Sequence, residues 1–295
     1  MALGLEVKRT LGMGDTIFAL AAVHAYKQAR PKATVWFRAS HPLQALVECS
    51  SDVALLPTRA PEGRTIIDLD TTPTDTDECR YHRMAAELGV APIDLTVPWQ
   101  FPKHIEERVR QDFPQISNAV VFTPWCGGFT PTRSIPDRVI REFIEYCPHA
   151  LLLRHVEKKA GFERVPNNIC GWHFGEIYLA VLLKQAKAVV SVDSGPAYLA
   201  ISVGTPTVVA FTHIAARSRL GAADIEKSTV EVWEPQLDCV PCGDFPDPAN
   251  PPCSANGSGR AACAKSICVD DLLERLHKVV NYLRLKPEAC HSQEA

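Results

Sequence analysis

One short run of the chain combines residue types and spacing that suit a phosphate. Asp193-Ser194-Gly195 follows an apolar, β-branched run, and after a segment of small and apolar residues Gly204-Thr205-Pro206 leads into a second such run. This order predicts a strand, a turn, a helix, a tight turn and a second strand, and the first turn would lie where α/β proteins bind ligands. Free backbone amides at the start of the helix suit a phosphate or a nucleotide. An ordinary turn without a ligand explains the same residues equally well.

Cysteines near the C-terminus are a second chemical signal. Cys239 and Cys242 have C-x-x-C spacing, and Cys253, Cys263 and Cys268 follow within the next 26 residues. Four thiolates suit Zn or Fe in tetrahedral geometry, and a metal would order a segment with so few apolar residues. We expect Cys239, Cys242, Cys253 and Cys263 to hold a structural metal, with Cys268 as the alternate ligand. Reduced thiols in a proline-rich loop are the alternative, and four cysteines do not distinguish Zn from Fe.

The elements that must position these residues alternate along the chain. Strands are expected at 5–11, 33–38, 65–70, 119–123, 150–154 and on either side of the helix between Gly195 and Gly204. Further helices are expected at 16–28, 42–48, 81–88, 104–113, 136–145, 174–185 and 269–285. Alternating strands and helices indicate parallel sheets. Because the pattern restarts near residue 116, we expect two facing Rossmann-like α/β domains. They are residues 1–115 and 116–285, the second including an irregular Cys-rich segment at 235–268, and residues 286–295 form a tail.

Composition narrows the class of protein. The chain has 295 residues, 46% of them hydrophobic and 22% charged, which is ordinary for a globular protein. A net charge of −3 disfavours a general nucleic-acid surface. The longest apolar runs are too short to span a membrane, and the first residues do not resemble a secretory signal. We therefore expect a cytoplasmic protein whose eleven cysteines are thiols or metal ligands rather than disulfides.

Four segments, taken in order, resemble the ADP-heptose:lipopolysaccharide heptosyltransferases, which are two-domain enzymes of the GT-B fold. The segments are Gly14-Asp15 before an Ala- and Leu-rich helix, Arg133-Ser134-Ile135-Pro136 where the family has Lys-x-Trp-Pro, Asp193-Ser194-Gly195 with Gly204-Thr205-Pro206-Thr207 where it has Asp-Thr-Gly and Gly-Thr-Pro-Thr, and the cysteine cluster. The resemblance covers most of the chain. It implies transfer of a sugar, with heptose from ADP-heptose the first guess, from a nucleotide diphosphate to an acceptor hydroxyl with inversion.

The resemblance also implies roles for two charged residues. Asp15 matches the family's general base, which takes the proton from the acceptor hydroxyl. Without the resemblance, an Asp that caps the following helix would explain it. Arg133 matches a cation that neutralises the leaving diphosphate, whereas a solvated loop arginine is the ordinary interpretation.

The nucleotide-binding residues follow in the same way. Gly14, Thr132, Asp193, Ser194, Gly195 and Tyr198 are expected to bind the nucleotide sugar. Tyr198 stands where the family has His, and a tyrosine donates a hydrogen bond but carries no cation at neutral pH. No catalytic metal is expected, and Asp68-Leu69-Asp70 is interpreted as a strand end rather than a metal-binding D-x-D motif. The final helix is expected to pack on the N-terminal domain.

The acceptor and the partners stay open at this stage. The short N-terminal half suggests an acceptor other than the usual lipopolysaccharide core: a glycan, a protein, a small metabolite or modified DNA. A homo-oligomer is possible. Two other classes compete, namely another GT-B enzyme such as a nucleotide-sugar epimerase or hydrolase, and a non-catalytic protein that assembles through the Cys-rich segment.

Overall fold

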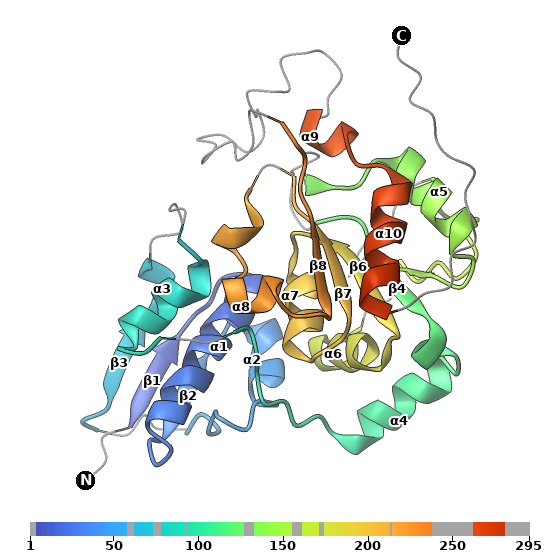
Figure 1. Ribbon diagram of the computed structural model, residues 1–295. Helices are drawn as coiled ribbons and strands as arrows, with labels where there is room; N and C mark the ends of the chain where they lie inside the picture. The colour runs from blue at the N-terminus through green and yellow to red at the C-terminus, as the bar shows by residue number, and fades with distance from the viewer. Residues whose placement is uncertain are drawn as a thin grey trace.

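The strands form two parallel sheets, one in each half of the chain (Figure 1). The computed structural model describes residues 4–57, 62–72, 78–91, 94–126, 133–154, 161–170, 174–212, 214–237 and 262–280. The N-terminal sheet has the order β2-β1-β3, with β1 (Leu5–Lys8), β2 (Val35–Arg38) and β3 (Thr65–Asp68). Because the chain runs from the central strand first to one side and then to the other, the carboxyl end of β1 is a topological switch point, where open α/β sheets bind ligands.

A long helix leaves the carboxyl end of β1. Helix α1 (Met13–Ala29) starts directly after Gly12 and carries Asp15 in its first turn and Lys27 in its last. These charges suit the helix dipole, and the Ala-rich sequence favours the helix. The other helical elements of this half are α2 (His41–Val47), the 3-10 helix η1 (Leu69–Thr71), α3 (Arg80–Glu87), α4 (Lys103–Asp112) and the 3-10 helix η2 (Ile116–Asn118).

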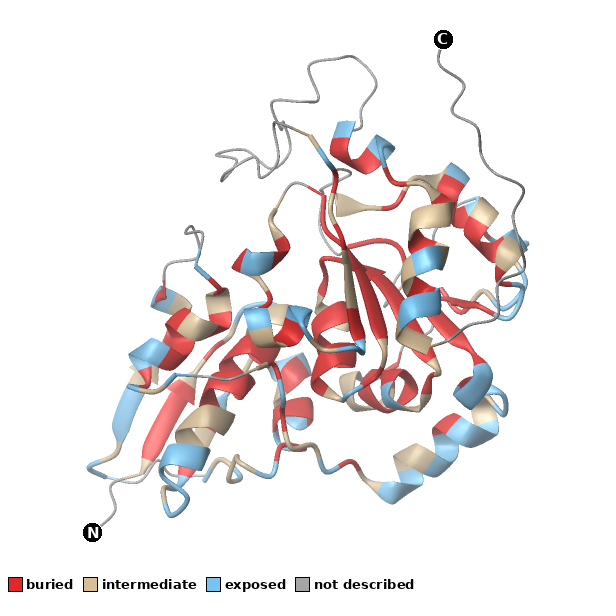
Figure 2. Ribbon diagram, in the orientation of Figure 1, coloured by how far each residue is buried: buried red, intermediate tan, exposed pale blue. Residues whose placement is uncertain are grey.

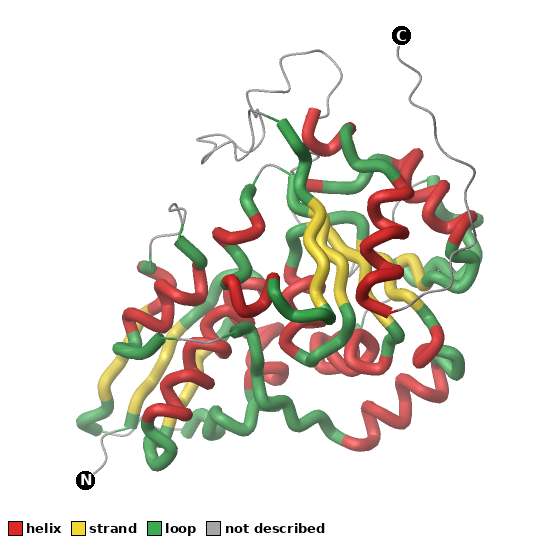
Figure 3. The backbone as a smooth tube through the Cα atoms, viewed as in Figure 1, coloured by secondary structure: helices red, strands yellow, loops and turns green. Residues whose placement is uncertain are grey.

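The C-terminal sheet is larger and has the order β5-β4-β6-β7-β8. Its strands are β4 (Val120–Thr123), β5 (Leu151–Leu152), β6 (Ala188–Val192), β7 (Thr207–Ala210) and β8 (Val230–Trp233). The helical elements are α5 (Asp137–Tyr146), α6 (Glu176–Gln185), α7 (Gly195–Ser202), the 3-10 helix η4 (Ala216–Ser218), α8 (Ala222–Ile225), α9 (Ala262–Lys265) and α10 (Val269–Val280) (Figure 3). The second switch point lies between β4 and β6.

The C-terminal sheet is buried on both faces, as parallel sheets usually are. Strands β4, β6 and β7 are buried throughout (Figure 2). Alternate residues of β6 face opposite ways, so Val189 packs in the cluster that contains α6 and α7, and Val190 in the cluster that contains α5 and α10. The N-terminal sheet differs, because Ile66 on β3 is 55% exposed.

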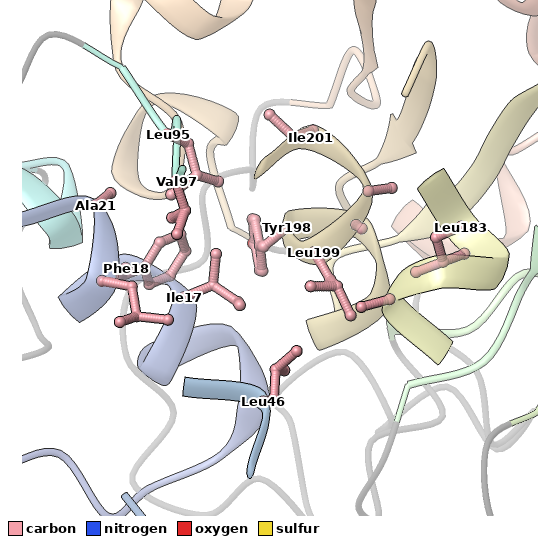
Figure 4. Packing of buried hydrophobic residues seen from close by; sticks show 14 of the residues in the cluster. Ile17, Phe18, Ala21, Leu46, Leu95, Val97, Leu183, Tyr198, Leu199 and Ile201 are labelled. Carbon is pink, nitrogen blue, oxygen red and sulfur yellow. The ribbon is translucent and has the colours of Figure 1, made fainter. Parts of the chain in front are cut away.

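One apolar cluster joins the two halves of the chain. It contains Phe18 of α1 together with Tyr198 and Leu199 of α7 (Figure 4). The rings of Phe18 and Tyr198 lie 4.5 Å apart. Leu95 and Val97 belong to the same cluster; they lie in the segment between α3 and α4, called the linking segment below. The two sheets are therefore held together by a shared core rather than by a linker alone.

The structure corrects three expectations about the elements. Helix α1 begins at Met13 rather than at residue 16, so Gly14 and Asp15 lie in its first turn and not in a preceding turn. Strands β1 and β3 end at Lys8 and Asp68, earlier than expected, and η1 follows β3 directly. Helix α10 packs against β6, β7, β8 and α5, not against the N-terminal half.

The apolar stripe of α10 explains its position. Leu272 and Leu276 are fully buried in the cluster of the C-terminal sheet. Polar contacts to β8 reinforce this packing, since Arg275 Nε donates to the Val232 carbonyl at 2.9 Å and Trp233 Nε1 donates to Asp271 at 3.0 Å.

Among the helices of the described ranges, none is long and apolar enough to cross a membrane.

Candidate active site

A cleft of about 510 Å³ opens where the carboxyl ends of the two sheets face each other. Its N-terminal wall is formed by residues 12–15 after β1 and by Arg80. Its C-terminal wall is formed by the residues after β4 and after β6, with Arg219 from the loop that follows β7. Both switch points of the fold thus border one cavity, which is the place where this architecture binds ligands.

Asp15 is the acidic residue of the N-terminal wall. It lies in the first turn of α1, and its side chain is 19% exposed. Arg80 NH1 donates to Asp15 Oδ1 at 2.6 Å, and Arg9 NH2 lies 3.1 Å from the same oxygen. These two guanidinium groups hold the carboxylate in position at the cleft. The helix cap proposed as the alternative is not seen, because the N-cap residue is Gly12.

Arg9 is fully buried behind Asp15. It donates to the Leu69 carbonyl and lies 4.0 Å from Asp70 Oδ1. Asp70 also accepts from the Thr10 amide at 2.8 Å and from the Thr10 hydroxyl at 2.6 Å. Burial alone would raise the pKa of Asp70, but the Thr10 hydrogen bonds and the Lys8 ammonium hold it below its usual value. The Asp70 carboxylate is thus already bound by Thr10 and Lys8.

The C-terminal wall is organised around Asp193, whose side chain is 5% exposed. Arg133 NH2 donates to its Oδ2 at 2.8 Å and to its carbonyl at 2.6 Å. The Tyr198 hydroxyl donates to its Oδ1. Burial lowers the pKa of Arg133, but the Asp193 charge outweighs it and leaves the pKa raised. Burial and the same carboxylate raise the pKa of Tyr198, so the phenol stays neutral. Asp193 therefore holds Arg133 in place at the cleft.

The turn between β6 and α7 presents backbone amides to the cleft. The N–H groups of Ser194 and Gly195 make no hydrogen bond within the described residues, and Pro196 has no N–H. Ser194 Oγ lies 3.1 Å from Ser191 Oγ, which accepts from the Thr123 hydroxyl at 2.6 Å. This chain of hydroxyls joins the ends of β4 and β6 and fixes the side chain of Ser194.

Glycines allow the two helix starts to touch. A Cβ on Gly195 would lie 2.8 Å from Met13 Cβ, and one on Gly14 would lie 3.0 Å from the Tyr198 ring. Real Cβ atoms essentially never lie 2.8 Å from another carbon, and at 3.0 Å the Tyr198 ring would have to move by a few tenths of an ångström. Gly14 and Gly195 therefore set how near the two walls of the cleft lie.

Several cleft residues lie outside every sequence motif. Arg80, Arg154 and Arg219 line the cavity, as do Trp125 and Cys126. The Arg219 guanidinium makes no ion pair or hydrogen bond within the described residues, whereas its backbone amide donates to the Ala216 carbonyl at 2.8 Å. With Arg133, four arginines and two aspartates face the cleft, so its lining is cationic. No pattern marks these arginines, because each lies on a different element; only their position after strands or at a helix start is informative.

Several of the other residues predicted for the site lie outside the part of the chain that the structure describes. Thr132, Cys239, Cys242 and Cys253 lie outside the described residues. Cys263 is buried in α9, and Cys268 accepts the Asp271 amide at 3.5 Å at the start of α10. Groups of three or more potential metal ligands are absent from the part of the chain that the structure describes. Asp68 and Asp70 belong to no such group, and both form ion pairs with Lys8.

Comparison with known proteins agrees with this geometry. No curated protein matches the sequence. A glycosyl transferase family 9 protein from Veillonella parvula superposes with a TM-score of 0.68 at 12% identity, over 95% of this chain and 99% of that one. ADP-heptose lps heptosyltransferase II from E. coli gives 0.65 at 11% identity, over 95% and 99%. TibC from enterotoxigenic E. coli, described as an iron-containing dodecameric glycosyltransferase, gives 0.68 at 13% identity, over 95% and 77%.

The family model of glycosyltransferase family 9 (heptosyltransferase) matches residues 157–251, which include the β6–α7 turn and β7. The two parallel sheets match heptosyltransferase structures of the GT-B fold. The two comparisons agree: residues 157–251 match the model of glycosyltransferase family 9, and the chain has the fold of solved structures described as a heptosyltransferase and as a family 9 glycosyl transferase.

Proposed function

We propose that the protein transfers heptose from ADP-heptose to an acceptor hydroxyl with inversion. The observation that carries the proposal is the composition of the cleft: a carboxylate on one wall faces arginines and free helix-start amides on the other. Inverting transfer needs a base beside the acceptor and positive charge beside the departing diphosphate. TibC and E. coli WaaC support the choice of donor, since their structures contain ADP-D-β-D-heptose and ADP-2-deoxy-2-fluoro heptose.

In the proposed reaction Asp15 is the base. Its ionised carboxylate would take the acceptor proton as the acceptor oxygen attacks the anomeric carbon. Arg80 and Arg9 orient the carboxylate toward the cleft. Arg133 and Arg219 would neutralise the charge that develops on the diphosphate as the bond to the sugar breaks. The amides of Ser194 and Gly195 would donate to the same phosphate oxygens.

Asp193 and Tyr198 have a different proposed role from the one expected. The Asp193 carboxylate accepts hydrogen bonds from Arg133 and from the Tyr198 hydroxyl. We therefore propose that they position Arg133 and do not bind the nucleotide directly. Gly14 supports the site by allowing α1 to approach α7.

The test is ADP release from ADP-heptose in the presence of candidate acceptors. Asp15→Asn should lose transfer by about 100-fold or more while ADP still binds. Asp52→Asn is the matched control, because Asp52 pairs with His24 at 2.7 Å and does not line the cleft. Because Asp15 pairs with buried Arg9, thermal stability is measured for both variants. Transfer by Asp15→Asn at the wild-type rate would refute the base assignment, and no ADP binding by wild type would refute the donor.

A structural metal at Cys239, Cys242, Cys253 and Cys263 is proposed alongside. TibC supports the proposal, since it is described as iron-containing. Thiolates at these positions would crosslink the Cys-rich segment to α9.

We also propose that the chain forms a homo-oligomer, since TibC is described as dodecameric. Light scattering after size-exclusion chromatography tests this.

A further inference from the structure

A second contact between the two halves lies beside the cleft, at helix α3. Tyr81 of α3 is fully buried, and its hydroxyl donates to Oδ2 of Asp224, which lies on α8 of the C-terminal half and is also fully buried. The Gly221 amide donates back to the Tyr81 oxygen at 3.2 Å. Burial and the Asp224 carboxylate raise the pKa of Tyr81, so its hydroxyl remains a donor.

Asp224 is the centre of this junction. Its Oδ1 accepts the amide of Leu95, in the linking segment, at 2.8 Å, and Lys227 Nζ lies 3.4 Å from it. A buried carboxylate is tolerated only when donors and a counter-charge surround it. Here the donors come from α3, from the linking segment and from the C-terminal half. Removing any of them leaves a buried charge under-satisfied, so the three segments are held together.

The junction leaves no free space between α3 and the loop before α8. A Cβ on Gly221 would lie 2.5 Å from the Tyr81 hydroxyl and 2.8 Å from His82 Nε2. The loop therefore cannot slide along α3 without breaking the Tyr81 contacts.

Two cleft arginines adjoin this contact in the sequence. Arg80, which holds Asp15, precedes Tyr81, and Arg219 lies two residues before Gly221. We propose that Tyr81 and Asp224 are positioning residues that fix Arg80 and Arg219 relative to each other across the cleft. The inference rests on the proposed function in one respect, namely that Arg219 contacts the diphosphate.

The first test needs no ligand. Hydrogen exchange is measured on the full chain for Tyr81→Phe, which keeps the ring and removes the hydroxyl. Exchange should accelerate about tenfold both in residues 80–88 and in residues 216–226. Trp99→Phe is the matched control: it also removes one hydrogen bond between the linking segment and the C-terminal half, to Ser202 at 3.2 Å, but away from the cleft. Unchanged exchange in either segment of Tyr81→Phe overturns the inference, whatever the ligand.

The second test is a double-mutant cycle on ADP affinity, measured by calorimetry. Arg219→Gln should weaken ADP binding about tenfold in the wild-type background, and less than threefold in Tyr81→Phe, because Arg219 is already displaced there. In Trp99→Phe the full tenfold effect should remain. Additive effects of Tyr81→Phe and Arg219→Gln would overturn the positioning role.

Two further outcomes keep the inference separate from the proposed function. If Tyr81→Phe does not fold, Gly221→Ala displaces the same loop sterically and replaces it in both tests. If wild type binds no ADP, the proposed donor fails, and the exchange result alone decides the junction.

Discussion

The pair of Arg133 and Asp193 allows the structural and the ligand-binding roles of one arginine to be separated. Arg133→Gln removes the charge but keeps a polar side chain of similar reach. It removes the charged partner of Asp193, whose side chain is 5% exposed and still accepts from the Tyr198 hydroxyl. Adding Asp193→Asn removes the second charge, so the double variant keeps neither charge of the ion pair.

The magnitude follows from the geometry. At 2.8 Å and an effective dielectric constant of about 20, two unit charges attract by about 6 kcal/mol. Desolvation of both groups offsets much of this, and the Arg133 side chain is 28% exposed. We expect Arg133→Gln to lower the free energy of unfolding by about 2–3 kcal/mol, and the double variant to differ from wild type by about 1 kcal/mol. Loss of a charged contact to phosphate should weaken ADP binding by about 1.5–3 kcal/mol, or roughly 10- to 150-fold, in both variants.

Urea unfolding and calorimetric titration with ADP measure the two effects on the same protein samples. Arg138→Gln is the control, because its pair with Glu142 at 2.8 Å lies on the exposed face of α5 and should affect neither quantity. Recovery of stability without recovery of ADP affinity in the double variant would match the expectation. If the double variant bound ADP as tightly as wild type, Arg133 would not contact the diphosphate. If Arg133→Gln were as stable as wild type, the ion pair would contribute nothing to the fold.

Three other expectations concern the N-terminal sheet, the helix contact and the cysteines. Burial alone would raise the pKa of Glu6, but hydrogen bonds and ion pairs with Arg38 and Arg64 hold this pKa below its usual value. Glu6→Gln should therefore lower the free energy of unfolding by about 1–2 kcal/mol at pH 7 and leave it unchanged once the pH falls well below 4.5. Urea unfolding of both proteins across this pH range should show their stabilities becoming equal at low pH. Gly195→Ala places a carbon 2.8 Å from α1 and should cost about 1–3 kcal/mol, whereas Gly175→Ala, with nothing within 4 Å, should cost less; equal melting temperatures would contradict the close contact. Cys263→Ser should reduce bound Zn or Fe, measured by elemental analysis of purified protein, and Cys268→Ser should not; the reverse result would exchange their assignments.

The sequence predicts the fold well where patterns are local. The β6–α7–β7 unit is readable because apolar runs flank Gly195 and Gly204, and Gly204 has the positive φ of 81° that a glycine allows. It also predicts that residues after β1, β4 and β6 meet, since carboxyl ends of parallel strands share an edge. It does not predict Arg80 or Arg219, whose approach depends on the packing of α3 against the loop before α8. The position of α10 was mispredicted for the same reason: an apolar stripe shows that a helix is buried, not which sheet covers it.

The cluster that contains Phe18, Leu95 and Leu199 has a consequence for how the protein folds. The N-terminal sheet has only three strands and leaves Ile66 exposed, and its helix α1 packs much of its apolar surface against α7 of the other half. The N-terminal half is therefore not an autonomous folding unit. The chain should lose its structure in a single cooperative transition, and a fragment ending near residue 115 should stay unfolded when expressed alone.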